Sequence, residues 1–404
     1  MIFCCKRILS ESELSRLKDY TFKPGNFTFL DRVMLHLLWE PVVRALPTWF
    51  SPNLLTLLGG LCVFIMNFFV FYYVPNFKAA SVPKWTSLVS SILVFAYTTF
   101  DGIDGMQARK LKLESPMGQL LDHGTDGLVS SFFCYFTFLV NPSGYSMVNA
   151  LITVSALINA SAVNWREENF GTFSYTNSFF IFGVSEPLLA VVSILFLNYF
   201  YPEFWLSPMV KVLRKYKSLR FLVKYLPKDL SWFTAFLYFA LAVSFYTFVG
   251  FPYEMYKSNK NAKNLIRLTL YLIFNCVFPP MLTLSLPQKL HGLYSIFVSS
   301  LGGIGVIFII ISNLRRKKHL LFYPEFLFHY LLVFMGYLLV LARVLFGLKY
   351  DKIVFNSLCF ERTLLFLTVL GIFLGLLKAI RVFHEIKTHL GLPFFTTKRP
   401  GKRS

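Results

Sequence analysis

The chain has 404 residues, of which 55% are hydrophobic and 15% are charged. Soluble domains carry roughly 25% charged residues, so this composition excludes an ordinary soluble protein and indicates a polytopic membrane protein. The net charge is +20, but the basic residues are scattered over short loops, which argues against a nucleic-acid partner and favours attraction to membrane lipid.

Residues 1–53 are expected to form a cytosolic and interfacial N-terminal segment. The apolar stretch at the start is too short for a signal peptide, so insertion is expected to begin at the first internal span. Residues 28–46 follow an amphipathic helical pattern that includes Trp39 and basic side chains. This pattern predicts a helix lying in the membrane interface.

The rest of the chain predicts an all-α, polytopic integral membrane protein with about ten transmembrane helices. A span needs roughly 20 predominantly apolar residues. The apolar runs cover 54–74, 85–101, 119–140, 148–163, 186–203, 232–250, 264–283, 291–312, 322–346 and 359–380.

One segment conflicts with the simple topology. Loops that would face the cytosol hold most of the Lys and Arg, in line with the positive-inside rule. Residues 211–228, KVLRKYKSLRFLVKYLPK, would fall on the other side although they are strongly basic. Either this segment is an amphipathic interfacial helix tolerated on the far side, or one of the predicted spans is wrong.

The stretch from residue 101 to 127, DGIDGMQARKLKLESPMGQLLDHGTDG, contains four aspartates: Asp101, Asp104, Asp122 and Asp126. The first pair is three residues apart and the second is four apart, so each pair presents two carboxylates on one helix face. Helix caps are a common role for aspartate, but carboxylates next to long apolar runs are costly and indicate a functional site. Oxygen ligands from two facing helices suit Mg²⁺ or Mn²⁺. With Arg109, whose guanidinium can bind phosphate, they suggest chemistry on a phosphoanhydride.

The same residues carry a family resemblance. The arrangement Asp101-x2-Asp104-Gly105-x2-Ala108-Arg109-x8-Gly118-x3-Asp122-x3-Asp126 resembles the motif of the CDP-alcohol phosphotransferase family at every defined position. The segments DGIDGMQAR and LLDHGTDG are further similar to the eukaryotic choline/ethanolamine phosphotransferase branch, as are segments 38–59, 164–172 and 384–395. The resemblance spans nearly the whole chain, although only the central motif agrees with the family at every defined position.

The resemblance implies a two-metal site for a CDP-alcohol. Two Mg²⁺ ions, with Mn²⁺ as an alternative, would neutralise the pyrophosphate and stabilise the departing phosphate. The implied ligands are Asp101, Asp104, Asp122 and, for the second ion, Asp126.

The acceptor hydroxyl needs a base, and two residues compete for that role. His123 adjoins Asp122 and lies three residues before Asp126, so it can reach the site and be oriented by a carboxylate. Asp126 is the rival base, but binding to metal would lower its basicity, which favours His123. Gln119 stands where the related branch usually has glutamate, so an acid at that position cannot serve as base here.

Arg109 is expected to bind the pyrophosphate, although a snorkelling surface arginine would have the same sequence context. Gly105, Ala108 and Gly118 are small where a nucleotide approaches the backbone, and helix–helix packing is the other explanation. Asn53 resembles a family position beside the cytidine nucleotide but equally fits a helix N-cap.

Three glutamates lie at predicted cytosolic ends of spans: Glu167, Glu168 and Glu186. Acids near aromatic residues suit a cationic head group. Solvated loop charges are the plainer interpretation of all three.

The resemblance implies transfer of phosphocholine or phosphoethanolamine from CDP-choline or CDP-ethanolamine to diacylglycerol. It further implies a location in the membrane of the endoplasmic reticulum or Golgi, with the site facing the cytosol. The expected assembly is a homodimer. The alternatives are a family enzyme with another acceptor and a catalytically silent lipid-binding or transport protein. The expected domains are residues 54–203 as catalytic core, 204–231 as a basic amphipathic loop, 232–381 as a C-terminal transmembrane half and 382–404 as a cytosolic tail.

Overall fold

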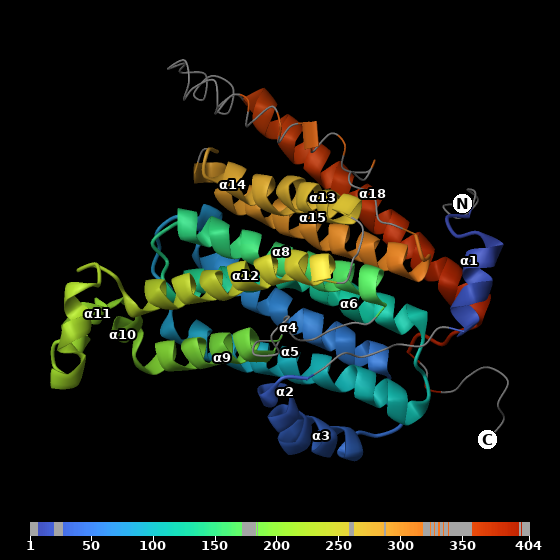
Figure 1. The fold of residues 1–404 in the computed structure, drawn as a ribbon, viewed down its shortest axis with the longest axis horizontal. Helices are drawn as coiled ribbons and strands as arrows, with labels where there is room; N and C mark the ends of the chain where they lie inside the picture. Colours follow the sequence, from blue (N-terminus) through green and yellow to red (C-terminus); the bar gives the residue numbers. More distant parts are fainter. Residues whose placement is uncertain are drawn as a thin grey trace.

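The computed structural model shows a bundle of helices that run side by side (Figure 1). It describes residues 7–19, 27–171, 183, 185–257, 262–286, 288–317, 358–395 and 397, with scattered positions between 324 and 338. Within these ranges every named element is a helix, so the expected all-α class is confirmed.

The helices have the following bounds: α1 Glu11–Arg16, α2 Phe29–Met34, α3 Glu40–Ala45, α4 Pro52–Tyr73, α5 Lys84–Leu111, α6 Pro116–Ser130, α7 Thr137–Val140, α8 Met147–Phe170, α9 Ser185–Phe200, α10 Pro202–Leu206, α11 Met209–Leu213, α12 Trp232–Lys257, α13 Ala262–Leu272, α14 Phe278–Thr283, α15 Gln288–Leu314 and α18 Leu358–Leu390.

Six segments of the described chain are long and apolar enough to cross a membrane: Pro52–Tyr73, Lys84–Leu111, Met147–Phe170, Leu265–Thr283, Gln288–Leu314 and Leu365–Leu390. Shorter apolar helices cover Ser185–Phe200 and Trp232–Tyr246. The chain is therefore a polytopic membrane protein, and the count of ten spans stays a prediction. The predicted span 322–346 lies largely outside the described residues.

Two predicted spans have different limits in the structure. The run 85–101 continues as α5 to Leu111, so Asp101 and Asp104 lie inside the helix rather than at its end. The run 119–140 is not one α-helix, because α6 ends at Ser130 and a 3-10 helix, Phe132–Phe136, connects it to α7.

The turn between α5 and α6 follows from its local sequence. Lys112 adopts a left-handed conformation, with φ of 56°, and ends α5. Ser115 then begins α6, since its Oγ accepts the backbone N–H of Gly118 at 3.1 Å. Pro116 occupies the first helical position, where its missing N–H costs no hydrogen bond. The two aspartate-bearing helices are therefore joined by only a few residues.

Helix α9 packs antiparallel on α5, which fixes the direction of both. The Ser91 hydroxyl donates to the carbonyl of Val192 at 2.8 Å, and near the start of α5 the Asn198 amide donates to Ser87 Oγ at 2.9 Å. The C-terminal end of α9 therefore lies beside the start of α5, and its N-terminal end lies toward Asp101.

The helical segment 29–45 packs across the aspartate-bearing end of α5. A Cβ atom on Gly102 would lie 2.3 Å from the Trp39 ring, so glycine is what allows this contact. Lys110 Nζ adds hydrogen bonds to the carbonyls of Val43 at 2.6 Å and Leu46 at 2.8 Å. The predicted helix is confirmed, and its position in the membrane interface stays a prediction.

Helix α15 of the C-terminal half packs directly against α6. A Cβ on Gly127 would lie 2.7 Å from Val306, and a Cβ on Gly303 would lie 2.6 Å from the Cα of Leu128. The Tyr135 hydroxyl, just after α6, donates to the carbonyl of Ser295 at 2.7 Å. The predicted boundary near residue 231 stays a prediction, but α15 contributes to the packing of the aspartate-bearing helix.

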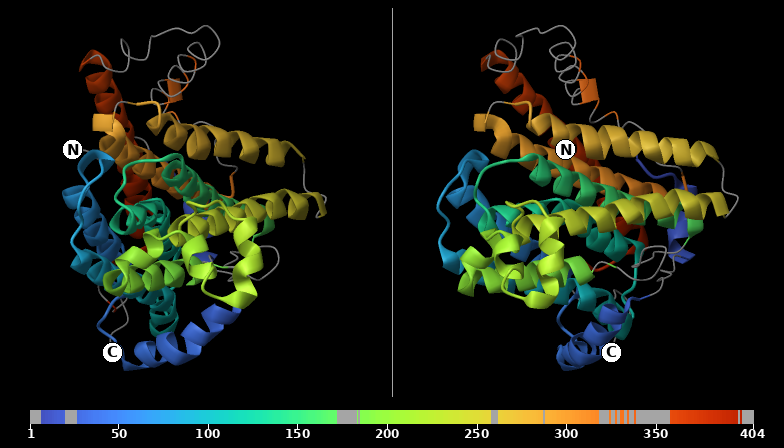
Figure 2. Two further views of the ribbon diagram at one scale, coloured as in Figure 1. Left: turned by 90° about the vertical axis from the view of Figure 1, so that its left-hand side faces the viewer. Right: turned by 60° about the vertical axis from the view of Figure 1, so that its left-hand side comes forward.

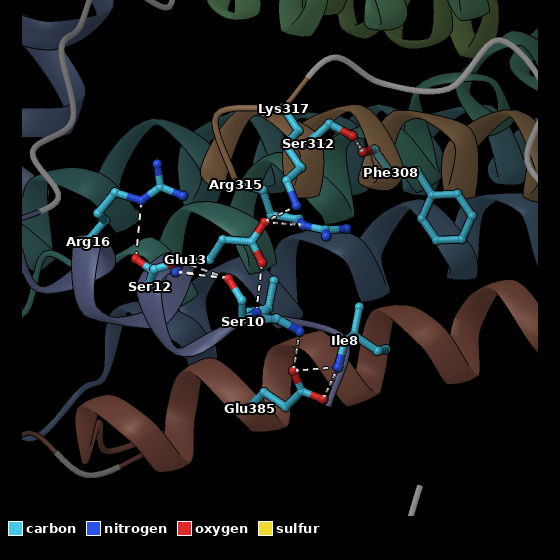
Figure 3. A network of polar contacts seen from close by, with 11 residues as sticks. Ile8, Ser10, Ser12, Glu13, Arg16, Phe308, Ser312, Arg315, Lys317 and Glu385 are labelled. Atoms are coloured by element: carbon cyan, nitrogen blue, oxygen red, sulfur yellow. Dashed lines mark hydrogen bonds and ion pairs between the residues drawn. The ribbon is translucent and has the colours of Figure 1, made fainter. Parts of the chain in front are cut away.

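The first described residues are bound to α18 and to the end of α15 (Figure 3). Glu385 accepts the backbone N–H groups of Ile8 and Leu9, each at 2.9 Å. Glu13, which is buried, accepts Arg315 Nε at 3.0 Å and lies 2.8 Å from Lys317 Nζ. Two carboxylates thus tie the N-terminal segment to the C-terminal helices.

Candidate metal and phosphate site

The four aspartates of the motif face one cavity of about 200 Å³. Asp101 and Asp104 reach it from the C-terminal half of α5, and Asp122 and Asp126 reach it from α6. The short turn between the two helices brings the two pairs of carboxylates together. The grouping predicted from their spacing is therefore present in the structure.

Three of these carboxylates are close enough to share a cation. Single oxygen atoms of Asp101, Asp122 and Asp126 all lie within 4.8 Å of one another, and all three side chains are half-buried. Like charges this close and this poorly hydrated repel each other strongly, so a cation between them stabilises the ionised state. The donor set consists of oxygen only, which fits a hard divalent ion.

Asp104 lies deeper than the other three. Its side chain is buried, and one of its carboxylate oxygens accepts the hydroxyl hydrogen of Thr56 from α4. Asp104 lines the same cavity but is not among the three carboxylates within 4.8 Å of one another. Its predicted role as a metal ligand stays a prediction, and its observed contact connects α5 to α4.

Asp126 is held from α5 by an aromatic hydroxyl. Tyr97 donates its O–H to Asp126 Oδ1 at 2.7 Å, and the Tyr97 side chain is buried. This hydrogen bond fixes one carboxylate oxygen of Asp126 from the side of α5.

His123 lines the cavity beside the aspartates and is buried. Its Nε2 lies 3.8 Å from Asp122 Oδ2, a contact between neighbours on α6. The predicted proximity of imidazole and carboxylate is present in the structure. The role of His123 as proton acceptor stays a prediction.

Arg109 and the three small residues, Gly105, Ala108 and Gly118, line the cavity. Arg109 is exposed near the end of α5, and its Nη1 lies 3.6 Å from where a Cβ of Gly105 would be. A Cβ on Gly118 would lie 3.4 Å from Ser115 Oγ. Both distances are ordinary contacts, unlike those at Gly102 and Gly127, so close helix packing does not explain Gly105 and Gly118. Ala108 also lines the cavity, and these positions leave space above the backbone.

Asn53 is not the N-cap that its sequence context allowed. Ser51 caps α4 by accepting the N–H of Leu54 at 3.2 Å. The Asn53 amide instead donates to the carbonyl of Phe394 at 2.8 Å. Leu392, Pro393 and Phe394 also line the cavity, so the C-terminal segment borders the site.

Gln119 is paired with a carboxylate from another helix. Its Nε2 donates to Glu167 Oε1 at 2.8 Å, and the Asn313 amide lies 3.4 Å from Glu167 Oε2. Gln119 lines the cavity and is buried, whereas Glu167 comes from the last turn of α8. Glu186, one of the other acids singled out in the sequence, accepts the N–H of Gly183 at 2.7 Å. Glu167 and Glu186 thus bind protein groups, and a head-group role stays untested.

Several residues at the site were not identified from the sequence. Tyr97 lies four residues before Asp101 on the same helix, so helical spacing was a usable signal. Thr56, Ser185 and Phe394 come from distant parts of the chain. Thr56 and Phe394 lie in the segments 38–59 and 384–395 that resemble the family branch, but no local pattern indicated that either residue lies at the site.

Comparison with known proteins covers this same region. Residues 49–213 match the family model described as CDP-alcohol phosphatidyltransferase. The chain is 31% identical over 157 residues to choline/ethanolaminephosphotransferase 1 of Saccharomyces cerevisiae, which covers 39% of this chain and 40% of the relative. It is 33% identical over 173 residues to ethanolaminephosphotransferase 1 of Mus musculus, covering 40% and 43%. It is 32% identical over 160 residues to cholinephosphotransferase 1 of Saccharomyces cerevisiae, covering 39% and 40%. The aligned part is about two fifths of the length of each relative.

Proposed function

We propose that the protein belongs to the CDP-alcohol phosphatidyltransferase family, whose model matches residues 49–213, and that it transfers phosphocholine or phosphoethanolamine from CDP-choline or CDP-ethanolamine to diacylglycerol. The observation that carries the proposal is the convergence of four aspartates and Arg109 on one cavity between α5 and α6. In the reaction the acceptor oxygen bonds to the phosphorus of the phosphoalcohol and the phosphoanhydride bond to CMP breaks. The products are CMP and phosphatidylcholine or phosphatidylethanolamine.

Asp101, Asp122 and Asp126 would hold divalent metal, with Asp104 as the fourth predicted ligand. Their oxygen-only donor set and mutual distances of at most 4.8 Å fit Mg²⁺, with Mn²⁺ as an alternative. Such ions, when bound, supply positive charge that offsets the pyrophosphate and the departing phosphate. The Tyr97 hydroxyl would orient Asp126 for this task.

Arg109 would bind the pyrophosphate at the mouth of the cavity. Its side chain is exposed and lies beside Gly105, so the guanidinium can reach a phosphate that rests on this part of α5. Gly105, Ala108 and Gly118 would let the nucleotide approach the backbone. Asn53 also lines the cavity and would position the C-terminal segment beside the nucleotide through its bond to Phe394.

His123 would accept the proton of the attacking hydroxyl. It lines the cavity, and Asp122 lies close enough to orient its ring. Asp126 remains the rival base, but its carboxylate already accepts the Tyr97 hydroxyl and would contact metal, both of which reduce its affinity for a proton.

We place the protein in the membrane of the endoplasmic reticulum or Golgi, with the aspartate-bearing end facing the cytosol, where a water-soluble nucleotide would enter. Diacylglycerol would arrive from the bilayer, and apolar residues such as Met117 and Leu188 line the cavity beside the aspartates. The homodimer predicted from the sequence finds no support in the structure or in the comparisons.

The test is a transfer assay with the purified protein in liposomes that contain diacylglycerol. CDP-choline and CDP-ethanolamine are supplied in parallel, with Mg²⁺ or EDTA, and CMP and the lipid product are measured. We expect CMP and phospholipid in equal amounts, only with divalent metal. CMP release with inositol or glycerol phosphate but not with diacylglycerol would assign another acceptor. No CMP release with any acceptor, from a folded protein, would indicate a silent lipid-binding or transport protein.

A further inference from the structure

A strongly basic surface lies at the end of the bundle opposite the aspartates. Ser185, at the start of α9, lines the cavity, and α9 then runs 16 residues to Phe200. At 1.5 Å per residue its far end lies about 24 Å away. The segment 209–228 follows at that far end, at the left of Figure 1, and Figure 2 shows it from that side.

The segment is folded, and backbone hydrogen bonds join its two ends. The backbone N–H of Met209 donates to the carbonyl of Leu230 at 2.8 Å, and that of Trp232 lies 3.4 Å from the carbonyl of Ser207. These bonds join the end of α10 to the start of α12. Between them lie α11 and a 3-10 helix, Lys217–Lys224. The segment is therefore a loop with its own helices at the end of two apolar helices, α9 and α12.

Its surface combines cations with aromatic rings. Seven basic side chains are exposed: Lys211, Arg214, Lys215, Lys217, Arg220, Lys224 and Lys228. Three aromatic side chains between them are also exposed, at 58% for Tyr216, 62% for Phe221 and 71% for Tyr225. Asp229 is the nearest acid in sequence, and among the described residues no carboxylate lies within 4.0 Å of these cations.

This combination suits a membrane surface better than water alone. Seven like charges repel one another, and an anionic partner would relieve that repulsion. Exposed tyrosine and phenylalanine rings are poorly placed in water, but aromatic rings are favoured at the level of lipid headgroups. The segment connects two apolar helices, α9 and α12. If these helices lie in the bilayer, the segment lies at the level of the lipid headgroups, where anionic headgroups can contact both kinds of side chain.

We propose that residues 209–228 form a docking surface for anionic phospholipid headgroups on the membrane face opposite the aspartate cavity. The basic side chains bind the headgroup phosphates, and the aromatic rings insert between the headgroups. Such docking would accommodate a segment that conflicts with the positive-inside rule in the first of the two ways left by the sequence, as an interfacial segment tolerated on the far side. The proposal does not depend on the transfer reaction.

The experiment measures thermal unfolding of the detergent-purified full chain with added phosphatidylglycerol or phosphatidylcholine. The test variant is Lys215→Gln/Lys217→Gln/Lys224→Gln/Lys228→Gln. The matched control changes the same four residues to arginine and so keeps the charge. A second control, Arg7→Gln/Arg16→Gln/Lys18→Gln/Arg44→Gln, removes four exposed charges at the opposite end of the bundle. Bound lipid is counted in parallel by native mass spectrometry, which gives a readout even where a variant is less stable.

Phosphatidylglycerol should raise the unfolding midpoint of the wild type and both controls by about 2–4 °C, and phosphatidylcholine should raise it by less. The glutamine variant of the basic surface should lose most of this shift and bind fewer phosphatidylglycerol molecules. The shift should also fall between low and high salt, because the charges are exposed. An equal shift or lipid count in the glutamine variant would overturn the proposal. So would an equal shift of the wild type by a soluble polyglutamate peptide, which would assign the surface to an acidic protein partner.

Discussion

Helix α9 connects two different regions: an acidic, largely buried region at its start and a basic, exposed region beyond its end. At its start, carboxylates of α5 and α6 are partly or fully buried around a small cavity. Beyond its end, seven basic side chains are exposed on the surface formed by residues 209–228. Buried like charges repel one another strongly, so a cation bound among the aspartates would stabilise the acidic end. Exposed like charges tolerate water, so the basic end binds a partner only at its surface.

The same helix connects the two regions, yet their side chains are expected to respond differently to mutation. Substitutions of the cavity aspartates and His123 should change turnover by orders of magnitude, since these are the proposed metal ligands and base. Substitutions at the basic end should change only lipid-dependent stability. The predictions below test this difference, beginning with the largest effect.

The first prediction concerns the carboxylates that would hold metal. Asp101→Asn and Asp126→Asn should each lower CMP release by at least about 10³-fold, because each would remove a proposed charged ligand of the metal that stabilises the transition state. Thermal unfolding supplies a readout that is independent of turnover. In EDTA each variant should be as stable as the wild type or more stable, since one of three repelling carboxylates is neutral.

Addition of Mg²⁺ should raise the unfolding midpoint of the wild type but not of these variants. A matched control is Asp229→Asn, which neutralises an exposed aspartate beside the basic surface and should leave turnover unchanged. Near-normal turnover in either Asp101→Asn or Asp126→Asn would contradict a metal site made of these residues.

The second prediction separates the two candidate bases. His123→Ala should lower turnover by about 10²–10⁴-fold, the usual contribution of general base catalysis. Binding of the CDP-alcohol, measured by calorimetry with the purified protein, should persist because Arg109 and the aspartates remain. Unchanged turnover in His123→Ala would assign proton transfer to Asp126.

The third prediction concerns the hydrogen bond between the side-chain amide of Gln119 and the carboxylate of Glu167. Gln119→Glu places a second carboxylate at the 2.8 Å contact with Glu167 and removes the donor. We expect a loss of stability of about 1–3 kcal/mol, seen as a lower unfolding midpoint at neutral pH. Glu167→Gln should cost less, since two amides can still form the hydrogen bond.

The charge-swapped double variant Gln119→Glu/Glu167→Gln provides the control. It restores one amide donor and one carboxylate acceptor with the positions exchanged, so most of the lost stability should return. If the double variant is as unstable as Gln119→Glu alone, the contact between the two side chains is not the cause of the effect.

The acidic end could be predicted from the sequence because its information is local. The four aspartates lie on two helices joined by a short turn, so helical spacing alone indicates that each pair shares a face. The Ser115–Pro116 cap is likewise a local signal that separates the helices. What spacing could not show is that Asp104 bonds to Thr56 while the other three approach one another.

The remaining features depend on contacts between distant residues. Gln119 forms a hydrogen bond with Glu167, which lies 48 positions further along the chain. Asn53 forms one with Phe394, which lies 341 positions further along. Apolar runs place helices in the sequence but do not predict where a helix is interrupted, as at Ser131 after α6. The location of the basic surface required the antiparallel packing of α5 and α9, which decides to which end of the bundle residues 209–228 belong.

The last prediction concerns Glu13, a buried carboxylate near the acidic end but outside the cavity. Burial raises its pKa, but hydrogen bonds from Lys317, the backbone of Ser10 and Arg315 outweigh that effect and lower the pKa to about 2 from its ordinary value of 4.5. The folded state therefore gains stability from ionised Glu13 above pH 4.5, and this gain is lost as the pH falls from 4.5 toward 2.

Glu13→Gln should accordingly lower stability by about 1–3 kcal/mol at neutral pH. The difference from the wild type should shrink below pH 4.5, as measured by unfolding at a series of pH values. Glu11→Gln, which removes an exposed acid on the same helix, is the matched control and should have little effect. Turnover of folded Glu13→Gln at neutral pH should stay near that of the wild type, because this carboxylate pairs with Arg315 and Lys317 rather than facing the cavity. A large loss of turnover without a loss of stability would mean that carboxylates outside the cavity also serve the reaction.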